Sequence, residues 1–158
     1  MFALVPVNTF GYKLMLLLHI LSVIVAFAPA FVWPFASVKL KKEGKPVGPA
    51  IGALAAGNTA KIHGPALVLV GLFGFGLVGM SKPAGSDVAV FSFSQSWLMA
   101  AATLWFIMLG IIFGMMLPAE KKSAAGDESA DKIVSMAGGI MHLLLLVMLF
   151  LMIWKPGL

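Results

Sequence analysis

The feature that most constrains this chain is a set of four long stretches without a charged side chain. They cover Leu14 to Val38, Ile62 to Ser81, Ser96 to Pro118 and Ile133 to Trp154. The hydrocarbon core of a bilayer is about 30 Å thick, and about 20 helical residues cross it. A helix also satisfies its own backbone hydrogen bonds, which lipid cannot do. The sequence therefore predicts four transmembrane helices, at about residues 11–38, 60–81, 96–118 and 131–154.

Composition supports the same fold class. The 158 residues are 61% hydrophobic and only 11% charged, whereas about a quarter of the residues in an average soluble domain are charged. Too few charges remain to cover a water-exposed surface, so much of the surface is expected to face lipid. We predict a single all-α domain over residues 1–158, a four-helix transmembrane bundle.

The distribution of lysine predicts how the bundle is oriented. All eleven basic residues are lysines, and eight of them lie in the connections 39–61 and 119–132, against three on the opposite side. Cytoplasmic loops carry an excess of lysine and arginine. The lysine-rich loops are therefore expected in the cytoplasm and both chain ends outside, in a bacterial cytoplasmic (inner) membrane. Since the lysines form no aromatic-interleaved stripe, no nucleic-acid partner is predicted.

Small residues predict where the helices approach one another closely. Gly110 and Gly114 form a small-xxx-small motif, which lets two helix backbones come together in lipid. Four further glycines in the second and fourth helices are expected to serve helix packing as well: Gly71, Gly74, Gly138 and Gly139. Packing within the bundle is the simpler interpretation, and contact with a partner protein is the alternative.

Three histidines are the only ionisable side chains in the four uncharged stretches. His19 and His142 each continue a stripe of small residues, namely Ser22, Ala26 and Ala30, and Ser135, Gly138 and Gly139. Both are therefore expected to point into the bundle, where a polar side chain is costly unless it is paired. They are candidate ligands of haem b. The alternative is that they, and His63 near the inner edge, make hydrogen bonds between helices.

Helix geometry argues against one haem bound by both histidines. At 1.5 Å per residue, His19 and His142 differ in depth by about 8 Å in a core of about 30 Å. Other chemistry has little support, because the four uncharged stretches contain no carboxylate and the sequence shows no phosphate-binding glycine loop and no nucleophile–base pair. Cysteine is absent, so thiolate metal sites are excluded. We predict no catalytic site and no metal site.

The first span carries a family resemblance. The run Leu18-His19-Ile20-Leu21 is followed by Ile24 to Phe31 and then by Pro34; Gly64-Pro65-Ala66-Leu67 opens the second span, and Leu117-Pro118 with a basic pair follows Trp97 downstream. This pattern resembles a family of bacterial, actinobacterial-type predicted integral membrane proteins. That resemblance implies a four-helix membrane domain of unknown function. His19 and its apolar neighbours more distantly resemble the copper-resistance D proteins and the haem-binding membrane protoporphyrinogen oxidase.

These observations lead to two functional hypotheses. The first is a non-catalytic membrane protein, an accessory subunit of a larger respiratory or energy-transducing complex. It would contact the lipid bilayer and either a membrane-protein partner or a second copy of the chain. The alternative is a haem b-binding redox or haem-biosynthesis protein that uses His19 or His142.

Overall fold

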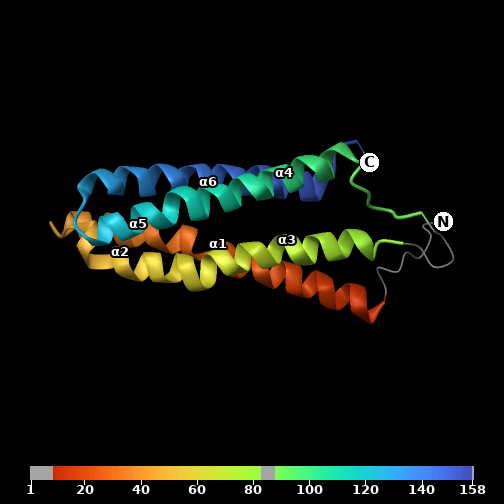
Figure 1. Ribbon diagram of the computed structural model, residues 1–158, viewed down its shortest axis with the longest axis horizontal. Helices are drawn as coiled ribbons and strands as arrows, with labels where there is room; N and C mark the ends of the chain where they lie inside the picture. The colour runs from red at the N-terminus through yellow and green to blue at the C-terminus, as the bar shows by residue number, and fades with distance from the viewer. Residues whose placement is uncertain (1–8, 83–87, 158) are drawn as a thin grey trace.

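The protein is an all-α bundle of four long helices, as predicted. The computed structural model describes residues 9–82 and 88–157. Four helices in these ranges are long and apolar enough to cross a membrane: Phe10–Lys42, Val47–Gly79, Ser96–Ala124 and Glu128–Trp154. They lie side by side along the longest axis of the molecule (Figure 1). The chain is thus an integral membrane protein with four candidate spans.

Two of the four helices contain a wide turn. The first helix, α1 (Phe10–Lys42), and the last, α6 (Glu128–Trp154), are continuous. The second consists of α2 (Val47–Asn58), the π-helical turn η2 (Thr59–His63) and α3 (Gly64–Gly79). The third consists of α4 (Ser96–Ile111), the π-helical turn η3 (Ile112–Met116) and α5 (Leu117–Ala124).

The second and third helices are longer than expected. The second begins at Val47, where the prediction began at about residue 60, and the third continues past Pro118 to Ala124. Helices of 33 residues, such as α1, are about 50 Å long and exceed the bilayer core of about 30 Å. The bundle therefore extends beyond the membrane core at one end. This is the end where α2 and α5 lie, opposite the C-terminus (Figure 1).

That end, which we call the lysine-rich end, has two short connections. It carries Lys39, Lys41, Lys42, Lys45, Lys121 and Lys122. Gly44 (φ +69°) follows α1, and Gly126 (φ +94°) lies between α5 and α6. Glycine has no Cβ that would clash at such positive φ values, so these residues allow the chain to reverse in a few positions.

Close packing of α2 against α5 explains why the second helix starts early. A Cβ atom on Gly52 would lie 2.8 Å from the backbone nitrogen of Ala124 and 2.9 Å from its Cα, and one on Gly48 would overlap Ser123. Gly48 and Gly52 thus form a small-xxx-small contact that brings two backbones together. Residues 47–58, which lie outside the predicted span, are helical here, and the glycine face of this helix packs directly on the backbone of α5.

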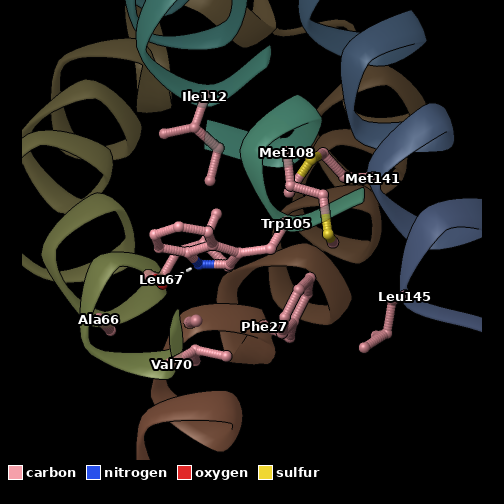
Figure 2. Packing of buried hydrophobic residues seen from close by; sticks show 10 residues of the cluster. Phe27, Ala66, Leu67, Val70, Trp105, Met108, Ile112, Met141 and Leu145 are labelled. Carbon is pink, nitrogen blue, oxygen red and sulfur yellow. Dashed lines mark hydrogen bonds between the residues drawn. The ribbon is translucent and has the colours of Figure 1, made fainter. Parts of the chain in front are cut away.

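The main core lies midway along the bundle and is built around Trp105. Its ring lies among Leu67, Val70 and Met108 (Figure 2). The indole Nε1–H donates a 2.7 Å hydrogen bond to the carbonyl of Leu67. Gly71 makes room for the ring, since a Cβ there would overlap the indole. The ring therefore fixes α4 against α3 by both shape and hydrogen bonding.

The outward faces of the helices remain apolar. Leu146 in α6 is 63% exposed and Phe106 in α4 is 61% exposed, and α1 presents Ile24 and Phe31 to the outside. Patches of this kind are rare on monomeric soluble proteins. Lipid around the bundle would cover them.

The connection between the second and third helices folds back over the end of the bundle. The Phe91 amide donates to Ser81 Oγ (3.0 Å), and the Val90 amide donates to the Ser81 carbonyl (2.8 Å). No strand forms among residues 88–95. Trp97 packs in a T-shaped contact with Phe91 and is only 4% exposed, so it belongs to the core.

Candidate functional site

Two cavities within the bundle contain all three histidines. The first, called the apolar cavity, has a volume of about 510 Å³ and is lined by His19, Val70, Gly74, Trp97 and Trp105 among others. The second, called the polar cavity, has a volume of about 390 Å³ and lies toward the lysine-rich end. Its polar lining includes His63, Glu120, Ser123, Asp131 and His142.

His19 is held in the apolar cavity by a bond to the neighbouring helix. Its Nδ1 lies 2.9 Å from the carbonyl oxygen of Val70, so Nδ1 carries the proton and donates it. Gly74 leaves space for the ring, since a Cβ there would lie 3.3 Å from His19 Cε1. The stripe of Ser22, Ala26 and Ala30 is buried, as expected. The remaining ring nitrogen, Nε2, has no hydrogen-bond partner among residues 9–82 and 88–157.

His142 has a different environment. Its Nδ1 donates to the Gly138 carbonyl of the same helix (2.7 Å), and its ring makes a T-shaped contact with Phe31 at a centroid distance of 5.4 Å. Ser135 and Gly139 are exposed, yet they line the polar cavity together with Gly138 and His142, so the stripe faces this cavity and not the packed core. The buried face of α6 is formed instead by Ala137, Met141 and Leu145. His19 and His142 line different cavities, so the structure does not bring them together.

The most buried charged side chain among the described residues is that of Glu120, which was not among the predicted site residues. Glu120 is 1% exposed, and so is His63, which lines the same cavity. Neither oxygen of Glu120 and neither ring nitrogen of His63 has a hydrogen-bond partner in the described part of the chain. Thr59 lies near the Glu120 carboxyl group, although the geometry falls short of a hydrogen bond. Three buried polar side chains thus lack partners within one small region.

Both buried groups lie at or just after a π-helical turn. His63 ends η2, where the Gly64 amide donates to the Thr59 carbonyl, and Glu120 follows η3, where the Leu117 amide donates to the Ile112 carbonyl. Pro65 follows Gly64, and Pro118 follows Leu117. Proline lacks the N–H that would continue the hydrogen-bond ladder of an α-helix. The prolines inside α1 cause no such turn, so proline permits the wide turn and does not enforce it. Single π turns are frequent at functional sites.

Glu120 was missed because the third span was expected to end at Pro118. A charged residue followed by Lys121 and Lys122 then looked like the start of a solvated loop. The burial pattern is nevertheless helical, with Met116, Ala119, Glu120 and Ser123 all buried, a spacing typical of one helix face. Ala119 and Ser123, two small residues at helical spacing, were the sequence signal that the helix continues past Pro118.

The six glycines assigned to packing fall into two groups. Gly71 and Gly74 lie against Trp105 and His19 inside the bundle. For Gly110, Gly114, Gly138 and Gly139, an added Cβ would meet no atom within 4 Å. Gly110 and Gly114 are exposed on the third helix, so their motif packs against no residue within the described ranges 9–82 and 88–157.

The described residues contain no group of three or more histidine, cysteine, aspartate or glutamate side chains that could hold a metal ion. Comparison with known proteins found no matching family model, no matching curated protein and no matching solved structure. The resemblance to the bacterial membrane-protein family therefore rests on the quoted motifs alone, and function has to be argued from the geometry of the bundle.

Proposed function

We propose that this chain is a non-catalytic accessory subunit that assembles with another protein in a bacterial cytoplasmic membrane, in a respiratory or other energy-transducing complex. The observation that carries the proposal is the open glycine face of the third helix. Gly110 and Gly114 are exposed, and none of the residues that the structure describes occupies the space beside them. Between helices in lipid, a face of small residues lets two backbones approach closely.

The surrounding surface agrees with a lateral partner. Phe106 and Phe113, which lie close to these glycines along the third helix, are exposed large apolar side chains. In lipid, van der Waals packing rather than the hydrophobic effect drives helix association. A glycine groove beside large side chains offers the shape complementarity that such packing needs.

Native mass spectrometry after extraction in a mild detergent tests the proposal. The wild-type chain is expected in a complex with a second, different membrane protein. The double substitution Gly110→Leu with Gly114→Leu should abolish that complex by blocking close approach. Gly79→Leu is the matched control, because Gly79 is also exposed with no atom near an added Cβ. A wild-type chain recovered only as a monomer would contradict the proposal.

A second candidate, a haem-binding protein, is favoured by one observation at His19. The Nδ1 of this residue is bound to a backbone carbonyl, which is how the second nitrogen of a metal-bound histidine is usually held. The adjoining apolar cavity has a volume of about 510 Å³. An absorption spectrum of protein from haem-replete cells distinguishes the candidates: a Soret band that disappears in His19→Ala but remains in His142→Ala supports haem binding at His19.

A further inference from the structure

The polar cavity contains a carboxyl group that the rest of the described chain leaves unpaired. Glu120 is buried, lines the cavity and accepts no hydrogen bond at either oxygen. A buried ionised group is costly unless it is paired and hydrogen-bonded. Such a group in a native protein calls for a partner that the protein atoms do not supply.

The lining contains a second carboxyl group, that of Asp131. Asp131 is half-buried and accepts from Ser123 Oγ through one of its oxygens (2.5 Å). Lys41, an exposed residue, is the one lysine in the lining. It pairs with neither carboxyl group, since the single ion pair among the described residues joins Lys45 to Glu43. Two carboxyl groups thus face the cavity without an ionic partner.

The cavity is large enough for a small organic molecule. Its volume of about 390 Å³ is within the range of ligand pockets, about 300–1,000 Å³, and a water molecule takes about 30 Å³. Phe27 and the Trp33 ring of α1 provide an apolar wall, and the Trp33 indole N–H is a further buried group without a partner among the described residues. The lining therefore matches a ligand with an apolar or flexible body and one donor-rich charged group.

The cavity can be reached from the lysine-rich end. Exposed Lys41 and half-buried Asp131 belong to its lining, and the helices here extend past the length that a bilayer core requires. A ligand could enter from water or from the headgroup layer of the membrane.

We propose that the polar cavity binds a primary ammonium group, with Glu120 as its main partner and Asp131 nearer the entrance. An ammonium group has three N–H donors and no acceptor, and its hydrogen bonds to carboxylate are charge-assisted and strong. A ring nitrogen of neutral His63 accepts from the same group. The ammonium comes from a soluble amine or from the headgroup of an ethanolamine phospholipid, since both present the same chemistry.

The first experiment uses a soluble probe. The full chain is placed in nanodiscs of phosphatidylcholine, whose headgroup nitrogen has no N–H, and benzylammonium binding is followed by isothermal titration calorimetry. We expect binding at least tenfold tighter than for benzyltrimethylammonium or benzyl alcohol. Glu120→Gln should weaken binding at least tenfold. Glu128→Gln, which alters an exposed carboxyl group at the same end, should leave it unchanged.

The second experiment distinguishes the two sources of the ammonium. Nanodiscs with phosphatidylethanolamine replace those with phosphatidylcholine alone, and the benzylammonium titration is repeated. The site is assigned to the lipid headgroup if phosphatidylethanolamine weakens the apparent affinity of the wild type for benzylammonium threefold or more. The same change of lipid should have no such effect on the Glu120→Gln variant. Unchanged affinity assigns it to a soluble amine.

A third variant keeps the proposal falsifiable if Glu120→Gln does not fold. Asp131→Asn alters the half-buried carboxyl group near the entrance and should weaken benzylammonium binding at least threefold. The proposal is wrong if the probe shows no preference over its two comparators, or if neither cavity variant that folds differs from wild type.

Discussion

At the scale of single residues, the same amino acid has opposite roles according to what lies beside it. Gly71 lies under the Trp105 indole, where a Cβ would overlap the ring, whereas Gly79 of the same helix has open space around it. The neighbours that decide this come from another helix and are distant in the sequence. Glycine in a span therefore indicates a close approach only once the facing helix is known.

We predict that Gly71→Ala destabilises the protein by about 1–3 kcal/mol, the usual cost of overpacking a core. The indole cannot move away without losing its 2.7 Å hydrogen bond to Leu67. Reversible unfolding of purified protein in mixed micelles measures the change. Gly79→Ala is the control and should be neutral or slightly stabilising, because alanine has the higher helix propensity. Equal stabilities of the two variants would refute this packing.

At the scale of elements, the contact between α2 and α5 determines the shape of the lysine-rich end. Gly48 and Gly52 lie against the backbone of residues 123 and 124, so neither helix can move aside as a flexible side chain could. The polar cavity is lined by both of these helices. Its geometry consequently depends on a glycine contact outside the residues expected to span the membrane.

We expect Gly52→Ala to cost about 1–3 kcal/mol of stability and to loosen α2 and α5 specifically. Hydrogen exchange followed by mass spectrometry should show faster exchange in residues 47–58 and 117–124, with little change in α4. Gly57→Ala provides the comparison within the same helix, as an added Cβ there meets nothing within 4 Å. Unaltered exchange in Gly52→Ala would mean that the two helices are not in close contact.

The start of α6 is capped by Asp127, which predicts a pH dependence. Its Oδ1 accepts from the Ser129 hydroxyl (2.6 Å) and amide (3.0 Å). These hydrogen bonds from Ser129 lower the pKa of the Asp127 carboxyl group below its ordinary value. A lowered folded-state pKa contributes stability above the ordinary pKa, and that stability is lost as the pH falls through the folded value.

Asp127→Asn keeps an acceptor at the cap but removes the titrating charge. The thermal midpoint of the wild type should therefore fall more steeply than that of Asp127→Asn as the pH is lowered below about 4, near the ordinary pKa of aspartate. Differential scanning fluorimetry over this pH range measures both slopes. Identical slopes would show that the cap does not contribute.

At the scale of the whole molecule, the ends of the bundle differ in charge. One end carries the polar cavity and six lysines, which lie in the last turns of α1 and α5 and in the connection after α1. The other end carries the C-terminus and the connection that begins at Ser81. The positive-inside rule predicts that the lysine-rich end lies in the cytoplasm.

This orientation can be tested directly because the chain contains no cysteine. Ala125→Cys and Ser94→Cys introduce single thiols at exposed positions of opposite ends. In intact cells treated to permeabilise only the outer membrane, a membrane-impermeant maleimide should label Ser94→Cys, and it should label Ala125→Cys only after lysis. The reverse pattern would invert the topology.

The sequence by itself determined that four helices form and that each is long and apolar enough to cross a bilayer. Long uncharged stretches have no alternative in a bilayer, where a backbone must bond to itself, and this holds whatever the neighbouring helices are. The burial of Ser22, Ala26 and Ala30 was also predicted correctly, because residues at this spacing along one helix share a face.

Only the tertiary structure decided where those helices end and which polar groups they bury. Residues 47–58 form a helix because α5 packs on their glycines, and Glu120 is buried because α5 continues past a proline that the sequence marked as an end. His19 and His142 share a residue type and a predicted direction, yet they line separate cavities. Each outcome depends on contacts between segments distant along the chain, and a local pattern of apolar and polar residues does not encode such contacts.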